Sequence, residues 1–170
     1  FDVETGPLNG GSFRVYVQHR GGKQDFSQRA QDLYREENKT WAPDTDAWRG
    51  FAHRVAEQTR ALQEVVRRET DAGKTIFIRG ASTRGLVILE HAKLDHWIKI
   101  AADRDPQKRG RLYGASKVKI ISEGEARDMR PDYYLPLIYS YLPELMGREQ
   151  AFLQRGGKFI VPLPEVRTVP

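Results

Sequence analysis

The sequence predicts an α/β fold in which a mainly parallel sheet is flanked by helices. After residue 74, short runs rich in β-branched and aromatic residues alternate with helical segments, in the order β-α-β-β-α-β. The connections are short, and parallel strands joined in this way require helices on the faces of the sheet. Residues 1–73 instead predict a strand and helices. We therefore expect an N-terminal strand and helical extension ahead of the core.

The extension should open with one strand and a short helix. Residues 12–17 alternate polar and apolar side chains, which is the period of a half-buried strand, and glycine pairs stand on both sides. Ser27 is expected to cap a helix that runs to about Asn38. The inner face of this helix should carry Ala30, Leu33 and Tyr34.

A long amphipathic helix follows, beginning at Asp44 or Asp46 and ending at Gly73. Apolar residues recur in it at steps of three and four, which predicts a single buried face. That face consists of Trp48, Phe51, Val55, Thr59, Leu62 and Val66. We expect this stripe to belong to the core and not to a cofactor site.

The remaining segments predict a Rossmann-like core at 74–170, and we expect the whole chain, 1–170, to form a single domain. Strands are expected at 75–79, 98–102, 118–121, 133–138 and 158–161. Helices are expected at 83–92 and 143–154, and a Ser-x-x-Glu capping box at Ser122 opens another. Ligands of such sheets bind beyond the carboxyl ends of the strands, near the point where the strand order reverses.

The composition excludes several classes of protein. The 170 residues are 39% hydrophobic and 30% charged, as in a soluble globular domain. No apolar run approaches the ~18–20 residues of a membrane span, so no membrane partner is expected. The chain has no cysteine, which excludes disulfides and thiolate zinc sites and suits a cytoplasmic location. It begins at Phe1 without a methionine, and we expect a fragment of a longer protein.

Positive charge is concentrated in residues 99–119, which hold seven bases and two acids. The surplus equals the net charge of the whole chain, +5. A local positive field of this kind favours phosphate-bearing ligands. A nucleic-acid-binding module is one alternative. Aromatic residues for base stacking are few there, however, with Tyr113 inside the window and Trp97 just outside it.

The first candidate site is a loop of small residues between a predicted strand and a predicted helix. It consists of Gly80, Ala81, Ser82, Thr83, Arg84 and Gly85. Small residues let a ligand approach the backbone, and the positive end of the following helix attracts an anion. Ser82 or Thr83 could cap that helix. The spacing matches neither Gly-x-Gly-x-x-Gly nor a P-loop, and tight packing alone is the plain alternative.

Polar residues at the ends of later strands complete the candidate site. Asp103 and Asp105 follow the next strand, where an acid in dinucleotide-type folds accepts hydrogen bonds from ribose hydroxyls. Arg104 and Lys108 stand where they could meet phosphate or base. Tyr139 could stack on a base, bind a phosphate or simply fill the core. None of the four histidines has metal-ligand spacing, so we assign no metal site and no catalytic residue.

Five ordered blocks give the sequence a family resemblance over essentially its whole length. They are NGGSFRVY at 9–16, GASTRG at 80–85, ADRDPQKRG at 102–110, PDY at 131–133 and FLQRGGKFI at 152–160. In this order they resemble the C-terminal domain of the S-adenosylmethionine-dependent sugar C-methyltransferases. Members of that family methylate a carbon of nucleotide-linked deoxysugars.

The resemblance implies that this domain supplies the nucleotide-sugar pocket, with 80–85 and 103–108 similar to its wall. S-adenosylmethionine would be bound by a methyltransferase domain absent here, so no cofactor is expected in this chain, which alone should be inactive. The implied partners are a nucleotide-diphosphate sugar and the catalytic domain of the same polypeptide. Two alternatives stay open: a compact methyltransferase whose 80–85 loop binds S-adenosylmethionine or S-adenosylhomocysteine, and a non-catalytic scaffold domain.

Overall fold

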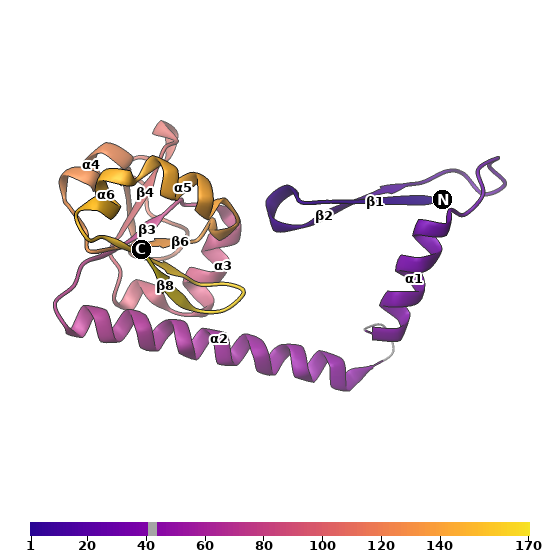
Figure 1. The fold of residues 1–170 in the computed structure, drawn as a ribbon, viewed down its shortest axis with the longest axis horizontal. Helices are drawn as coiled ribbons and strands as arrows, with labels where there is room; N and C mark the ends of the chain where they lie inside the picture. The colour runs from indigo at the N-terminus through magenta and orange to yellow at the C-terminus, as the bar shows by residue number, and fades with distance from the viewer. Residues whose placement is uncertain (41–43) are drawn as a thin grey trace. The chain divides into compact units, whose positions relative to one another are not determined.

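The computed structural model describes residues 1–40 and 44–170 (Figure 1). The chain divides into two compact units, Phe1–Arg54 and Val55–Pro170. The division falls inside helix α2 (Thr45–Asp71), ahead of the 73/74 boundary expected from the sequence. The first turns of α2 therefore belong to the first unit and the remainder to the second.

An antiparallel hairpin opens the first unit. β1 (Asp2–Gly6) pairs with β2 (Ser12–Tyr16), and a 3-10 turn, η1 (Leu8–Gly10), connects them. β2 confirms the predicted strand at 12–17. β1 was not predicted, because polar and apolar residues do not alternate along it.

The short predicted helix is confirmed as α1 (Gln28–Thr40). Ser27 caps it, since its Oγ accepts a hydrogen bond from the backbone N of Ala30 at 3.2 Å. Ala30 is buried, but Tyr34 is 63% exposed, so the expectation that Tyr34 faces inward was wrong. The helix meets the hairpin near its first turn, where Arg29 Nε donates to Asp2 Oδ1 at 3.1 Å, and Tyr34 lies beyond that contact.

The long helix α2 is confirmed, but its apolar face is only partly buried. Leu62 and Val66 are buried against the sheet of the second unit. Trp48 and Phe51 are 53% and 48% exposed and contact each other edge-on, with ring centroids 6.5 Å apart. The expectation of one continuous buried stripe was therefore wrong. A helical period shows which side chains share a face, and it does not show how much of that face is covered.

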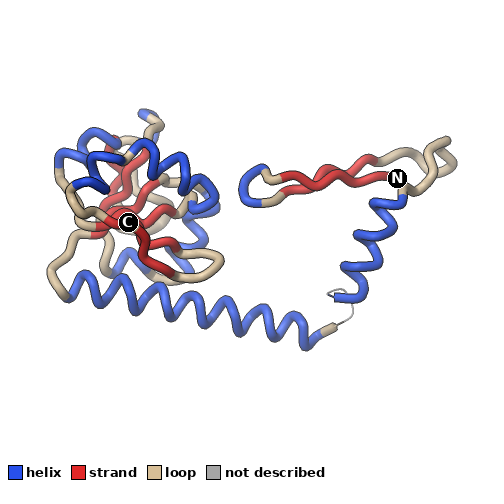
Figure 2. The backbone as a smooth tube through the Cα atoms, viewed as in Figure 1, coloured by secondary structure: helices blue, strands red, loops and turns tan. Residues whose placement is uncertain are grey.

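The second unit is built on a six-stranded sheet with the strand order β5-β4-β3-β6-β7-β8. The first five strands run parallel, and β8 runs antiparallel beside β7. The strands are β3 (Ile76–Arg79), β4 (Ile100–Asp103), β5 (Lys119–Ser122), β6 (Tyr133–Pro136), β7 (Lys158–Val161) and β8 (Arg167–Val169). The helices after α2 are α3 (Thr83–His91), α4 (Glu123–Asp128), α5 (Leu142–Arg148) and α6 (Gln150–Gln154). The predicted fold class is confirmed (Figure 2).

Apart from shifts of one or two residues at the ends of elements, the structure departs from the predicted elements at three places in this unit. β8, a strand of three residues, was not predicted. The predicted helix at 143–154 is two helices, α5 and α6, separated at Glu149 with φ −110° and ψ 32°. The strand expected at 133–138 ends at Pro136, and a 3-10 turn, η4 (Tyr139–Tyr141), follows it.

Both faces of the sheet are covered by apolar clusters. An aliphatic cluster from α2, α3 and the sheet includes Leu62, Val66, Ile76, Ile78 and Leu89. An aromatic cluster on the opposite face includes Phe77, Tyr134, Phe152 and Phe159. Side chains alternate along a strand, so Arg79 shares the face of Phe77 and brings a charge toward α4 and α5. Within the described residues, no helix is both long and apolar enough to cross a membrane.

Candidate functional site

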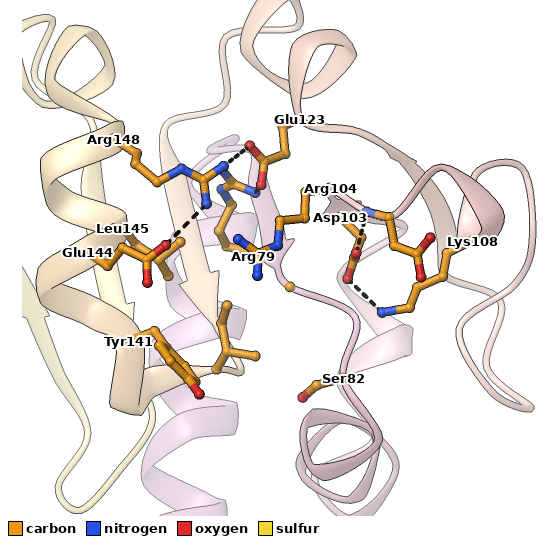
Figure 3. Close-up of a pocket in the computed structure, with 13 residues that line it drawn as sticks. Arg79, Ser82, Asp103, Arg104, Lys108, Glu123, Tyr141, Glu144, Leu145 and Arg148 are labelled. Carbon is orange, nitrogen blue, oxygen red and sulfur yellow. Dashed lines mark hydrogen bonds and ion pairs between the residues drawn. The ribbon is translucent and has the colours of Figure 1, made fainter. Parts of the chain in front are cut away.

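A cleft of about 390 Å³ lies at the carboxyl ends of β3 and β4 (Figure 3). From β3 the chain moves outward to β4 and β5 and then returns to β6 on the other side of β3. The cleft thus lies at the point where the strand order reverses, where open α/β sheets bind ligands. Its lining residues are Arg79, Gly80, Ser82, Asp103, Arg104, Asp105, Lys108, Glu123, Ile138, Tyr141, Glu144, Leu145 and Arg148.

The structure brings together some of the residues predicted from the sequence and leaves others aside. Those that line the cleft are Gly80, Ser82, Asp103, Arg104, Asp105 and Lys108. Those that do not line it are Ala81, Thr83, Arg84, Gly85 and Tyr139. Tyr139 begins the turn after β6 and packs against the aromatic cluster, so the core-filling alternative describes its position.

Gly80 has a packing reason to be glycine. Its φ of +87° lies in the left-handed region, which favours glycine. A Cβ at this position would lie 2.8 Å from Cδ1 of Ile138 across the cleft floor. The backbone N of Gly80 donates to Ala102 O at 2.8 Å, which ties the loop to the end of β4.

The start of α3 is also held by hydrogen bonds and close packing within the protein. Ser82 caps the helix, with its Oγ accepting a hydrogen bond from Gly85 N at 3.0 Å. A Cβ on Gly85 would lie 2.6 Å from both Leu137 Cβ and Tyr113 Oη. The buried Tyr113 donates to Ser82 O at 2.6 Å, and burial raises the pKa of its phenol. The protein's own contacts therefore account for the glycine at both ends of this loop.

Asp103 is a structural carboxylate inside the cleft wall. Its Oδ2 accepts hydrogen bonds from Ala81 N at 2.7 Å and from Lys108 Nζ at 3.1 Å, and its Oδ1 accepts one from Asp105 N at 2.9 Å. The residue is 9% exposed. Of the two acids that the sequence offers to ribose hydroxyls, Asp103 is thus engaged by three protein donors. Asp105 in turn accepts a hydrogen bond from Gln107 N at 3.0 Å, which starts the 3-10 turn η3 (Pro106–Lys108).

Arg104 differs from its neighbours on the same segment. It is exposed, lines the cleft, and makes no hydrogen bond or ion pair with any residue in 1–40 or 44–170. Its guanidinium is therefore available to a ligand. A planar guanidinium matches the oxygens of phosphate or carboxylate groups in a bidentate arrangement.

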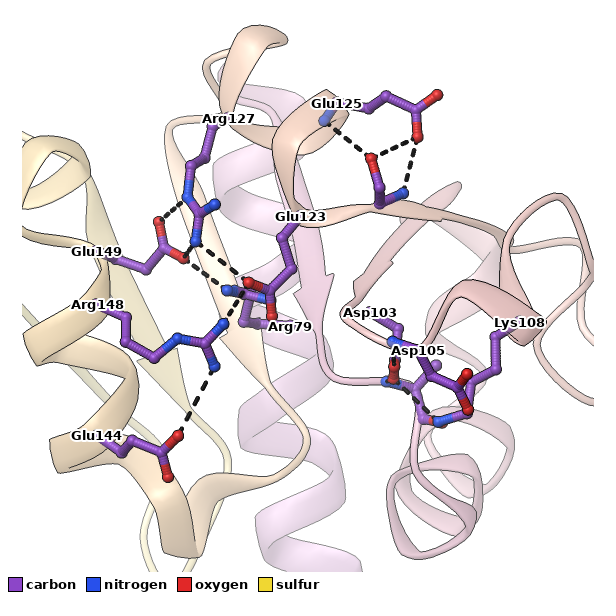
Figure 4. Close-up of polar contacts among 12 residues, drawn as sticks. Arg79, Asp103, Asp105, Lys108, Glu123, Glu125, Arg127, Glu144, Arg148 and Glu149 are labelled. Carbon is purple, nitrogen blue, oxygen red and sulfur yellow. Dashed lines mark hydrogen bonds and ion pairs between the residues drawn. The ribbon is translucent and has the colours of Figure 1, made fainter.

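A buried ionic network, which was not predicted from the sequence, forms the back of the cleft (Figure 4). Arg79, whose side chain is 2% exposed, lies 2.6 Å from Glu123 and 2.6 Å from Glu149. Arg127 donates to Glu149 from Nε at 3.0 Å and from Nη2 at 2.7 Å. Arg148 binds Glu123 and lies 3.7 Å from Glu144. The signal in the sequence was an arginine at the end of an apolar strand, because a buried charge requires partners.

The network fixes the protonation state of Glu123. Burial alone would raise the pKa of this carboxyl group, but hydrogen bonds and positive charge from Arg79 and Arg148 outweigh it and lower the pKa to about 2. Glu123 and Glu149 raise the pKa of Arg79 above its usual value, although burial alone would lower it. The cleft therefore has a charged and tightly held wall on the side of α4 and α5.

The basic window at 99–119 is less available to a nucleic acid than its composition suggests, because some of its side chains are bound within the protein. Lys99 Nζ donates to the carbonyl oxygens of Asp95 and His96 at 2.6 and 3.0 Å. Arg109 pairs with Glu125 at 2.7 Å. Tyr113, the aromatic residue inside the window, is 4% exposed and cannot stack on a base. This geometry offers little support for a nucleic-acid interface.

Comparison with known proteins identifies the family. The family model described as the C-methyltransferase C-terminal domain matches residues 7–164. The C-methyltransferase NovU of Streptomyces niveus is 32% identical over 169 residues, which is 99% of this chain and 40% of that protein. The chain thus spans about two fifths of the length of this relative. As the five sequence blocks predicted, the chain belongs to the C-methyltransferase C-terminal domain family.

Proposed function

We propose that this chain is part of an S-adenosylmethionine-dependent C-methyltransferase acting on a nucleotide-linked deoxysugar, and that its cleft binds the nucleotide diphosphate of that substrate. The observation that carries the proposal is the exposed guanidinium of Arg104, which faces a cleft at the reversal point of the sheet without a protein partner among the described residues. Such positions bind phosphorylated ligands in α/β folds.

The composition of the cleft supports this substrate class. Its volume of about 390 Å³ falls in the range of small-molecule sites. Arg104 on one wall and Arg148 on the other provide positive charge for a diphosphate. Ile138 and the ring of Tyr141, which is 38% exposed, provide apolar surface for a base or a sugar ring. A ligand with one anionic and one apolar part therefore matches the lining better than a bare anion does.

The methyl donor fits this cleft less well. S-adenosylmethionine carries an adenosine ribose, which Rossmann-type sites hold through a strand-end acid. Of the two strand-end acids here, Asp103 binds three protein donors and is 9% exposed, and Asp105 accepts a hydrogen bond from Gln107 N. We therefore propose that the donor, which supplies the methyl group, binds in another part of the polypeptide. The catalytic acid and base would also lie in that part, as would the surface on which this domain packs.

Calorimetric titration of the 170-residue chain with thymidine diphosphate tests the proposal. We expect binding by the wild type and a loss of about tenfold in affinity for Arg104→Ala, as for the removal of a charge-assisted hydrogen bond. Arg111→Ala is the matched control, because Arg111 is an exposed arginine in the same basic window that does not line the cleft. It should bind as the wild type does.

Two other results would favour one of the alternative functions. Binding of S-adenosylhomocysteine in place of the nucleotide would favour a compact methyltransferase. The absence of binding by any nucleoside diphosphate would favour a scaffold domain, an alternative that gains support from the internal contacts of Gly80, Gly85 and Asp103. Equal losses in Arg104→Ala and Arg111→Ala would show that the cleft itself is not the binding site.

A further inference from the structure

Four carboxylates line the cleft, and three of them already serve the protein. Asp103 accepts three hydrogen bonds, Asp105 caps a 3-10 turn, and Glu123 binds three arginines. Glu144 differs from all three, because its side chain is 54% exposed. Its one polar contact among the described residues is Arg148, at 3.7 Å, which is too long for a hydrogen bond. Both carboxylate oxygens of Glu144 can therefore accept hydrogen bonds from a ligand.

The position of Glu144 on the cleft wall restricts what those hydrogen bonds could be. Tyr141, Glu144, Leu145 and Arg148 follow the spacing of one helical face, and all four line the same wall (Figure 3). A phosphate held by Arg148 would lie near the negative charge of Glu144, which repels a further anionic group. The neighbouring part of the ligand must then be neutral and must donate hydrogen bonds. A sugar hydroxyl satisfies both conditions.

We propose that Glu144 determines specificity in this cleft by accepting a hydrogen bond from a pentose hydroxyl of the nucleotide. The inference rests on the proposed function and deepens it. In this arrangement the carboxylate that binds the hydroxyl is Glu144 on α5. The strand-end acid Asp103 lies on the opposite side of the cleft. Phosphate and pentose would then be read by neighbouring residues of one helix, Arg148 and Glu144.

A thermodynamic cycle between Glu144 and one ligand hydroxyl tests the inference. The ligands are thymidine diphosphate and 3′-deoxythymidine diphosphate, which differ only in that hydroxyl. Wild type should bind the first about tenfold more tightly, and Glu144→Ala should bind both equally, because the acceptor has gone. Glu144→Gln keeps an uncharged acceptor and should lie between them. Glu64→Ala, an exposed glutamate on α2, should retain the wild-type ratio.

The outcomes separate this inference from the proposed function. If wild type binds both ligands equally, or if Glu144→Ala keeps the tenfold ratio, the role of Glu144 is overturned while nucleotide binding stands. If neither ligand binds the wild type, the proposed function and this inference fail together. The ratio is measured within each variant, so a general loss of affinity through altered packing would leave it unchanged.

Discussion

Replacing Glu149 by alanine removes the less exposed of the two carboxylates that hold Arg79. Glu149 is 1% exposed, and it accepts hydrogen bonds from Arg79 at 2.6 Å and from Arg127 at 3.0 and 2.7 Å. The side chain of Arg79 is 2% exposed, so water cannot replace the lost acceptor without opening the core. Nε of Arg79 already lacks a hydrogen-bond partner within the part of the chain that the structure describes.

The size of the effect follows from what each arginine retains. Removing one partner of a buried ion pair destabilises a protein by about 3–5 kcal/mol. Arg79 keeps Glu123 at 2.6 Å, and Arg127 is 42% exposed and can regain water, which places the expected loss near the lower end, at about 3 kcal/mol. Domain stabilities of about 5–15 kcal/mol make this a large fraction of the total. In a domain of this size, the loss lowers Tm by about 10 °C.

Urea and thermal unfolding, followed by circular dichroism, measure this loss. Glu64→Ala is the matched control, since Glu64 is an exposed helical glutamate and its removal should change stability by about 0.5 kcal/mol or less. A second variant, Arg79→Met combined with Glu149→Ala, removes both charges and should lose less than the sum of the two single variants. The reasoning would be refuted if Glu149→Ala unfolded at the same urea concentration and temperature as Glu64→Ala. It would also be refuted if the loss of stability in the double variant equalled the sum of the losses in Arg79→Met and Glu149→Ala.

Three further predictions concern local geometry and pH. Gly85→Ala should lose about 1–3 kcal/mol by overpacking, because its Cβ would lie 2.6 Å from Leu137 Cβ, whereas Gly147→Ala, with open space around it, should be neutral or stabilising in the same thermal melts. Ser122→Ala should lower stability by about 1 kcal/mol, since Ser122 completes the capping box of α4; an unchanged urea midpoint would contradict this. The pKa of Glu123 is lowered from 4.5 to about 2 on folding, so its contribution is present above about pH 4.5 and is lost as the pH falls through 2. The urea midpoint of the wild type should therefore decline between these values more steeply than that of Glu123→Gln.

Sequence patterns predicted the sheet because they reflect local physical requirements. The run at 76–78 is apolar and β-branched or aromatic, and it forms a strand buried on both faces, as such runs do in parallel sheets. The Ser-x-x-Glu motif at Ser122 forms the capping box it predicts. The three-residue strand β8 carries too little pattern to be detected. The exposure of Trp48 could not be predicted, because it depends on which surfaces cover the helix.

Spacing along the sequence indicated which segments meet at the cleft, but not all of the charged groups that lie there. The turn after Ile78 and the end of β4 converge as expected, since carboxyl ends of neighbouring parallel strands meet at one edge of a sheet. Glu149, by contrast, reaches Arg79 across 70 positions of sequence. Glu144 follows β6 by several residues, and no short-range motif links it to the loop at Gly80. Pairings of this kind depend on tertiary packing, which spacing along the chain does not encode.

Some residues of the cleft are held by contacts within the protein and others are not, and the two classes should respond differently to substitution. Gly80 and Asp103 shape the loop through contacts within the protein, so changing either should reduce stability together with any binding. Arg104 and Glu144 have no hydrogen bond to another described residue, so changing either should reduce binding and leave stability nearly unchanged. Measuring both quantities for Asp103→Asn and Arg104→Ala distinguishes the two classes. If Asp103→Asn weakened nucleotide binding with no loss of stability, the strand-end acid would be a ligand contact after all, and the assignment of hydroxyl recognition to α5 would lose its basis.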